Sequence, residues 1–306
     1  MNQKAIKTSQ DKKITLPKDD NYLAIFLTFA CPRTCSYCLN EQGDGLKQRP
    51  IVEGEKWIRA LNSLETKLTL TFNGGEPLSH PDFYNIVNGL DESIKVDLLT
   101  TLPYNPAEFI ENLSPERFER DLPYAAIRVT YHSNAMDLEE TIEKVRRIKE
   151  AGFDIEINLV GDPQNSMKIR LIKEKVMSTG LGCVIKPFLG YLDGTLYGQF
   201  RYGDSCTMKS KKKVKCLTTQ LLIDPTGDVY RCYGDLFRQN PEGVLGDIFD
   251  PEVDLSMRYT DCHNFGFCHP CDVQIKFDRF SNWGYTAVEI VGNGVTSVKS
   301  SRVDWG

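Results

Sequence analysis

The feature that most constrains the fold is a regular alternation of short apolar runs and longer amphipathic segments between Tyr22 and Phe188. Six runs have the length and the β-branched or apolar composition of strands: Tyr22–Phe29, Lys67–Asn73, Val96–Thr100, Ala125–His132, Asp154–Val160 and Cys183–Phe188. The clearest helical segment between them ends at Gly152 and repeats apolar residues at Leu138, Ile142, Val145 and Ile148. Six strand–helix alternations predict an α/β fold with a parallel sheet, either doubly wound or rolled into a barrel.

The later strands carry polar faces that favour a barrel with a polar interior. Arg128 and His132 lie on one face of the fourth run, Glu156 and Asn158 on one face of the fifth, and Lys186 on the sixth. A fully packed barrel interior is dominated by Val, Ile and Leu. We therefore expect these polar side chains to line one concavity that holds a polar ligand. A buried Arg128–Glu156 ion pair that only ties two strands together is the alternative.

Ten cysteines are the outlier in an otherwise ordinary composition. The chain has 306 residues, enough for about two domains, and a net charge of −5, which gives no overall attraction to nucleic acid or anionic lipid. The polar segment 1–20 has no apolar core of the kind found in signal peptides, and no apolar run is long enough to span a membrane. We therefore expect a cytoplasmic protein. Cysteines in a reducing cytosol favour metal ligation, with a disulfide framework as the alternative.

Three of the cysteines lie on one short loop directly after the first strand. Cys31, Cys35 and Cys38 have C-x3-C-x2-C spacing. Thiolates gathered on one loop suit an iron–sulfur cluster, whereas structural zinc normally takes four ligands and this loop offers no fourth. Three ligands leave one iron of a 4Fe–4S cluster without a protein ligand. An open iron can bind and activate another molecule.

This loop resembles the signature of the radical S-adenosylmethionine (radical SAM) superfamily, and Tyr37 before the third cysteine matches it as well. The next strand ends in Asn73 followed by Gly74-Gly75-Glu76-Pro77, which is similar to the family's glycine-rich motif. The resemblance covers Tyr22 to Phe188 and implies a partial six-stranded (β/α)6 parallel barrel. We accordingly expect a radical SAM core over residues 21–205.

The resemblance also implies two cofactors, a 4Fe–4S cluster and S-adenosyl-L-methionine. Cleavage of the latter after reduction of the cluster yields a 5′-deoxyadenosyl radical, which abstracts a hydrogen atom from a substrate. Two glycines allow close approach of the backbone to a ligand, and Glu76 offers an acceptor for an ammonium group. The residues expected to contact S-adenosylmethionine are Tyr37, Gly74, Gly75, Glu76, Pro77, Thr100, Ser133 and Asn158. For the last three, a simple strand-end cap is the alternative.

Six further cysteines lie between Cys206 and Cys271, around a predicted hairpin at residues 221–230. This region, 206–306, resembles the twitch or SPASM auxiliary-cluster domain of radical SAM enzymes. Six cysteines are too few for the two clusters of the full form, so one auxiliary 4Fe–4S cluster is expected. Its predicted ligands are Cys216, Cys232, Cys268 and Cys271, with Cys206 and Cys262 in reserve. A structural zinc site is the alternative.

Three other features in this part of the chain have simpler interpretations. Cys183 lies within a strand and is expected to be an ordinary buried thiol. His263 and His269 are expected to face solvent. The basic run of residues 209–215 is expected to be a solvated loop, although it could also steer an anionic substrate or a reductase.

Taken together, these features predict a radical SAM oxidoreductase acting on a small polar substrate, with a net two-electron oxidation as the expected reaction. The candidate catalytic residues are Arg128, His132, Glu156 and Lys186. The expected reductant is a protein of the flavodoxin or ferredoxin type, and no nucleic-acid or membrane partner is expected. A maturase that modifies a peptide or protein is one alternative. A non-catalytic iron–sulfur electron carrier or binding protein is the other.

Overall fold

The computed structural model describes residues 13–16, 22–35, 38, 46–256, 258–275, 286–292 and 294–297. Its centre is a nine-stranded sheet in the order β14-β13-β12-β2-β4-β5-β6-β7-β8. Six of these strands are parallel neighbours: β2 (Tyr22–Phe26), β4 (Leu70–Asn73), β5 (Val96–Thr100), β6 (Ile127–Tyr131), β7 (Ile155–Gly161) and β8 (Gly182–Pro187). The predicted parallel α/β sheet is confirmed, and each predicted strand overlaps an observed one.

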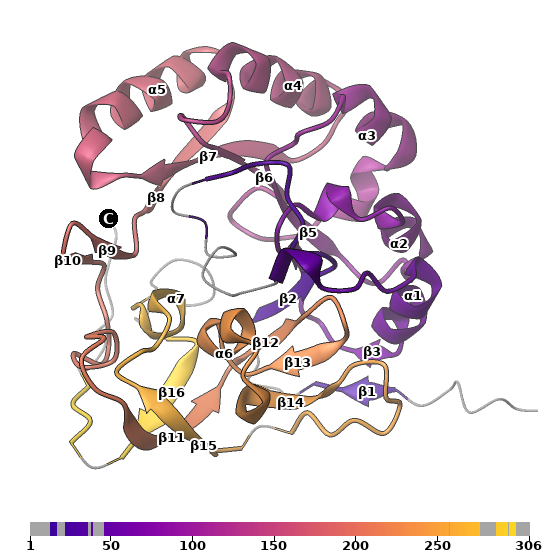
Figure 1. The fold of residues 1–306 in the computed structure, drawn as a ribbon. Coiled ribbons are helices and arrows are strands. Elements are labelled where there is room, and N and C mark those ends of the chain that lie inside the picture. The colour runs from indigo at the N-terminus through magenta and orange to yellow at the C-terminus, as the bar shows by residue number, and fades with distance from the viewer. Residues whose placement is uncertain are drawn as a thin grey trace, which may run out of the picture.

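Helices connect the parallel strands and cover the convex side of the sheet (Figure 1). They are α1 (Gly54–Asn62), α2 (Phe83–Gly89), α3 (Pro106–Asn112), α4 (Leu138–Glu150) and α5 (Ser166–Ser178). Ile142, Val145 and Ile148 of the predicted apolar stripe of α4 are buried, and Leu138 is half-buried. Helix α4 starts at an Asp137 cap whose side chain accepts a hydrogen bond from Glu140 N. The main core lies between these helices and the outward-facing strand residues, such as Leu23, Phe72 and Ile157.

The barrel is not closed, because β8 and β14 end the sheet order of the described residues at opposite edges. Side chains along a strand alternate between the two faces of the sheet. The apolar residues of β4–β8 face the helices, so the residues between them face the concave side. Buried polar side chains lie there, among them Thr71, Asp97, Arg128 and Asn158. The polar interior expected from the sequence is therefore present.

The predicted hairpin forms, but it extends the main sheet. Strands β12 (Gln220–Ile223) and β13 (Asp228–Tyr230) are antiparallel, and β12 pairs in parallel with β2 along its length. Strand β14 (Val244–Asp247) follows at the edge. On the concave side, α6 (Tyr233–Arg238) packs its Phe237 against Phe26 and Phe29 in a second apolar cluster.

The remaining elements are short. A separate antiparallel sheet joins β15 (Thr260–Phe265), β11 (Lys212–Thr218) and β16 (Val288–Val291), and α7 (Pro270–Val273) lies beside it. Two-stranded pairs form from β1 (Ile14–Thr15) with β3 (Leu64–Glu65) and from β9 (Gly190–Leu192) with β10 (Thr195–Tyr197). Among the described residues, every helix is too short or too polar to cross a membrane.

Candidate active site

The C-x3-C-x2-C loop leaves the carboxyl end of β2, where the sites of parallel barrels lie. Cys31, Cys35 and Cys38 are free, half-buried thiols, and Cys38 N donates a hydrogen bond to Cys35 O at 3.0 Å. Burial raises the pKa of Cys35 to about 11, and the negative charges of Cys38 and Cys31 raise it further. Three thiolates this close together repel one another unless a cation lies between them. The donor set therefore fits an iron–sulfur cluster. Tyr37 lies outside the described residues.

The glycine pair fixes the backbone of the loop that carries these cysteines. Gly75 N donates to Thr28 O at 3.0 Å, and Glu76 N donates to Ala30 O at 2.9 Å. A Cβ atom on Gly75 would lie 2.2 Å from Ala30 O, and Gly74 has a φ of +130°, which favours glycine. The sequence suggested that these glycines admit a ligand. In the structure, the close approach they permit is to the chain entering the cysteine loop.

Glu76 is fully buried, and its carboxylate accepts four hydrogen bonds from the protein. Oε1 accepts from Leu78 N at 3.2 Å and from Thr100 Oγ1 at 2.6 Å, while Oε2 accepts from Thr101 N at 2.7 Å and Thr101 Oγ1 at 2.8 Å. Burial raises the pKa of Glu76, and these hydrogen bonds oppose that rise. Both oxygens are thus used inside the protein, in place of the ammonium contact predicted for this side chain.

Two neighbours of Glu76 take part in the same arrangement. The hydroxyl group of Thr100, predicted to contact the cofactor, donates to Glu76 and accepts from Leu102 N at 2.8 Å. Pro77 is buried and opens a single 3-10 turn that ends at Ser79. The Gly-Gly-Glu-Pro segment therefore joins the carboxyl ends of β4 and β5 to the cysteine loop.

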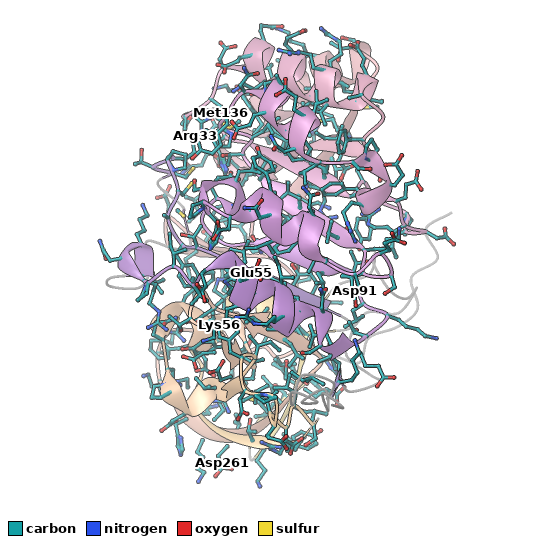
Figure 2. The ribbon with its side chains drawn as sticks, turned by 90° about the vertical axis from the view of Figure 1, so that its right-hand side faces the viewer. Arg33, Glu55, Lys56, Asp91, Met136 and Asp261 are labelled. Atoms are coloured by element: carbon teal, nitrogen blue, oxygen red, sulfur yellow. The ribbon has the colours of Figure 1, made fainter. Side chains whose placement is uncertain are left out.

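Arg33, which lies between the first two cysteines, reaches the loop after β6. Its Nη1 donates to Ala135 O at 3.2 Å, and Figure 2 shows Arg33 beside Met136. Burial and, after it, the positive charge of Arg33 lower the pKa of His132 to about 4. His132 is therefore neutral at physiological pH. Ser133 is half-buried next to it, at the carboxyl end of β6 as predicted.

The predicted polar residues of the concave face have partners that the sequence did not reveal. Arg128 is 1% exposed and pairs with Asp97 of β5 at 2.9 Å, and Arg120 pairs with the same carboxylate. The alternative expected from the sequence was a simple Arg128–Glu156 ion pair. That alternative did not include Asp97, which pairs with Arg128 in the structure. Burial raises the pKa of Glu156, while the charges of Lys186 and Arg128 lower it.

Two acceptor atoms on β7 face the concave side without a hydrogen-bond partner in the described part of the chain. These are Glu156 Oε1 and Asn158 Oδ1, both inaccessible to solvent. Residues two apart on a strand share a face, so the two acceptors point to the same side of the sheet. Glu156 also lines a solvent-open cavity at the amino ends of β6–β8, together with Tyr124 and Gly182.

A second group of cysteines lines one cavity formed by β11, β15, α6 and the segment before α7. The four are Cys216, Cys232, Cys262 and Cys268. Three were predicted as ligands, and Cys262, expected as a reserve, stands in place of Cys271. Cys271 lies within α7 and is not among the residues that line this cavity. Cys206 lies just behind Cys268, donating to its carbonyl oxygen at 3.3 Å.

The second cavity gathers thiols and buried charges. Cys216 and Cys262 hydrogen-bond to each other, which lowers the pKa of Cys262 to about 6 and raises that of Cys216. Arg231 lines the cavity and donates its Nε to Asp235 Oδ2 at 2.7 Å. A buried guanidinium offsets the charge that several thiolates would bring into this cavity.

Asp272 holds the two halves of this site together, a role that no sequence pattern had indicated. It is buried, accepts from Gln220 Nε2 at 2.7 Å and accepts from Tyr233 N and Gly234 N at the start of α6. It thereby fixes the segment after Cys232 against the segment after Cys268. Its position directly after Cys271 is the only local feature of the sequence that could have pointed to this role.

The four cysteines of the second group line a cavity. Among the described residues, no three His, Cys, Asp or Glu side chains are arranged to share a single metal ion. Zinc draws its thiolates to about 2.3 Å from one ion.

The remaining predicted residues differ in their exposure to solvent. Cys183 is buried in β8 as expected, and burial raises its pKa to about 11. His263 is exposed and lies 3.1 Å from Glu242, as expected for a solvent-facing residue. The expectation for His269 is wrong, because it is 5% exposed and packs against Tyr233 and Phe237.

Comparison with known proteins matches residues 25–174 to the family model described as the radical SAM superfamily. A GTP 3′,8-cyclase from Chlorobaculum tepidum is 37% identical over 68 residues, which span 22% of this chain and 20% of that protein. The match therefore covers about a fifth of the curated relative's length.

Solved structures show likeness at low identity. A structure of tagged anSMEcpe with bound AdoMet is 14% identical, with a TM-score of 0.50 over 75% of this chain and 76% of that one. Streptococcus suis SuiB bound to precursor peptide SuiA is 15% identical, with a TM-score of 0.44 over 78% of this chain and 63% of that one. The first of these likenesses shows the fold alone. The family match contains both the cysteine loop and the Gly-Gly-Glu-Pro segment, and on this ground residues 25–174 form a domain of the radical SAM superfamily.

Proposed function

We propose that the chain reductively cleaves S-adenosylmethionine and uses the resulting 5′-deoxyadenosyl radical to abstract a hydrogen atom from a polar substrate. The observation that carries this proposal is the loop of Cys31, Cys35 and Cys38, held in place by the Gly74-Gly75 turn at the carboxyl end of the sheet. A 4Fe–4S cluster held by these three cysteines would offer an open iron for S-adenosylmethionine to chelate and would supply the electron for its cleavage.

The side chains around this loop act by positioning. Glu76 uses both oxygens to join the turn to Thr100 and Thr101, so we infer that the ammonium group of the cofactor meets main-chain carbonyls of the turn instead. Ser133 and neutral His132 flank the same end of the sheet. Arg33 ties the cysteine loop to the β6–α4 connection. Fixed geometry of this kind limits access of water to a reactive radical.

The concave face of β7 indicates the class of substrate. Glu156 Oε1 and Asn158 Oδ1 are acceptors that no described donor satisfies, and an unsatisfied buried acceptor costs about 1–3 kcal/mol. A bound molecule that offers O–H or N–H groups would remove this cost. Arg128 already has an ion-pair partner in Asp97, which it shares with Arg120. We therefore propose a substrate rich in hydroxyl or amino groups.

We further propose that Cys216, Cys232, Cys262 and Cys268 bind an auxiliary 4Fe–4S cluster. Four thiolates would complete its coordination, leaving this cluster without an open iron. Such a cluster can accept the electron left on a substrate radical. That capacity favours a net two-electron oxidation over a redox-neutral reaction.

The first test is anaerobic reconstitution with iron and sulfide, followed by dithionite and S-adenosylmethionine. We expect 5′-deoxyadenosine from the wild type and none above background from Cys31→Ala. Equal product from both proteins would refute the proposed reaction.

The second test concerns the auxiliary site. About eight iron atoms per chain are expected in the wild type and about four in Cys262→Ala/Cys268→Ala. The matched control is Cys271→Ala, which should keep about eight because Cys271 lies off the cavity. One zinc ion in the second site would refute this ligand set. Iron loss in the Cys271→Ala control without iron loss in Cys262→Ala/Cys268→Ala would refute it as well.

A further inference from the structure

One stretch of the surface is strongly basic although the chain as a whole is acidic. The basic strip consists of Lys209, Lys211, Lys212, Lys213 and Lys215. Two carboxylates lie against it: Asp204 is 3.2 Å from Lys212, and Asp261 is 3.2 Å from Lys213 and 3.9 Å from Lys215. Five lysines against two carboxylates leave the strip with an excess of three positive charges, whereas the net charge of the chain is −5. The sequence suggested a solvated loop; in the structure Lys212, Lys213 and Lys215 lie on strand β11 with their side chains partly or largely exposed.

The strip lies directly outside the proposed auxiliary cluster site. Side chains of β11 alternate, so Lys213 and Lys215 point to solvent with side-chain exposures of 63% and 64%. Val214 and Cys216 point inward and are buried. The same holds on β15, where exposed Asp261 precedes buried Cys262. Only the backbone of two strands separates the basic surface from two of the four cysteines that line the cavity.

Exposed apolar side chains adjoin the lysines. Met208 is 50% exposed, and its left-handed conformation (φ 56°) is held by a 2.8 Å hydrogen bond from its N–H to Gly266 O. Tyr191 is 46% exposed, and its hydroxyl group donates to Thr207 O at 3.4 Å. Large apolar or aromatic anchors beside a charged rim are the usual composition of a protein interface.

We propose that the basic strip docks a small acidic electron-carrier protein, which takes from the cluster held by Cys216, Cys232, Cys262 and Cys268 the electron that the substrate radical leaves there. This inference rests on the proposed function, because it requires the auxiliary cluster. The cluster loses one electron and the oxidised carrier gains it, with no bond formed or broken, and a reduced carrier drives the same transfer in reverse. If the carrier holds an oxidised flavin, the flavin becomes a neutral semiquinone and takes up one proton from solvent.

Charge and position both favour this occupant. An acidic partner is repelled by a chain of net charge −5 except at the basic strip, so the strip selects one orientation of approach. Asp261, which pairs with Lys213 of the strip, is at the opposite end of the molecule from Arg33 of the first cysteine loop (Figure 2). A carrier docked here would reach the auxiliary cluster first. Electron-transfer encounters are weak and small, and a strip of this extent suits them.

The test measures reduction of the reconstituted enzyme by reduced flavodoxin, an acidic carrier, in a stopped-flow spectrometer at low ionic strength. Binding of oxidised flavodoxin, measured by calorimetry, is the second readout. The variant is Lys211→Glu/Lys213→Glu. The matched control is Lys168→Glu/Arg170→Glu, which makes the same charge change on exposed positions of α5, on the far side of the molecule (Figure 1).

We expect the strip variant to lower both the association constant and the rate of reduction at least tenfold, with less than a twofold change in the control. The difference should shrink as salt rises toward about 1 M, where the screening length falls to about 3 Å. Equal losses in the two variants, or no loss in either, would overturn the docking site.

Reduction by dithionite separates this inference from the proposed function. Dithionite needs no docking, so it reports whether both clusters are present. If dithionite yields 5′-deoxyadenosine but the charge-reversed strip variant binds flavodoxin as the wild type does, the docking site is refuted and the proposed function stands. If dithionite yields none from the wild type, the proposed function has failed by itself. Binding of a duplex oligonucleotide to the strip with no binding of flavodoxin would likewise refute this occupant.

Discussion

At the scale of single residues, the buried carboxylate of Glu76 is an organising contact of the site. All four of its partners are donors, which suits the ionised form. In Glu76→Gln one acceptor oxygen becomes an NH2 group that faces two of those donors. The threonine hydroxyls can rotate, but the N–H of Leu78 or Thr101 cannot. We expect the free energy of unfolding to fall by about 1–3 kcal/mol in chemical denaturation. Exposed Glu111→Gln is the control and should change it by less than about 0.5 kcal/mol; equal values for both variants would contradict the argument.

His132 makes stability depend on pH. Its pKa is about 4 in the folded chain, because of burial and then Arg33, against 6.5 for the free side chain. Between these values the unfolded state binds a proton that the folded state does not. Unfolding is therefore favoured as the pH falls from 6.5 toward 4, by up to about 1.4 kcal/mol per pH unit. Denaturation of the cluster-free chain at about pH 7.5 and about pH 5.5 should show this loss, and His132→Gln should show less of it. An identical loss in the variant would exclude His132 as the source.

At the scale of elements, Gly75 links β4 to the cysteine loop through van der Waals contact. A methyl group there would overlap Ala30 O and Phe29 O, both of them backbone atoms that cannot rotate away. Gly75→Ala should therefore displace the loop and reduce iron bound at Cys31, Cys35 and Cys38 by more than half. Gly203→Ala is the control, since nothing lies within 4 Å of its added Cβ. Iron analysis in a Cys262→Ala/Cys268→Ala background isolates the first site, and full loading of Gly75→Ala there would refute the contact.

What could be predicted at this scale was whatever lies close together in sequence. The cysteine loop, the Gly-Gly-Glu-Pro segment and the strands each occupy fewer than a dozen residues, and hydrophobic period and spacing reveal them. The partner of Arg128 is different, because Asp97 reaches it only through the register of β5 against β6. The choice of Cys262 over Cys271 likewise follows from the pairing of β15 with β11, which sets Val214 opposite Cys262. No local pattern encodes the register of strands that lie tens of residues apart.

At the scale of the whole molecule, the expected boundary at residue 205 separates parts that share one sheet. Strand β12 covers the edge of β2 with four paired residues, from Gln220 against Tyr22 to Ile223 against Ile25. The sequence showed the hairpin itself but could not show what it pairs with, because an edge strand and an inner strand have the same apolar composition. The segment 206–306 therefore supplies both the second cysteine group and part of the wall of the barrel.

This shared sheet predicts that residues 1–205 do not fold alone. Removing the rest exposes the hydrogen-bonding edge of β2 and uncovers Phe26 and Phe29, which pack on Phe237. Each uncovered aromatic side chain loses about 2–3 kcal/mol of burial, and an unpaired apolar edge promotes aggregation. The truncated chain should elute as aggregates in size-exclusion chromatography, and co-expression with residues 206–306 should restore a soluble complex. A monomeric fragment 1–205 with a cooperative unfolding transition would instead establish the boundary at 205 as a true domain limit, because such a fragment could fold only if β2 tolerates an open edge.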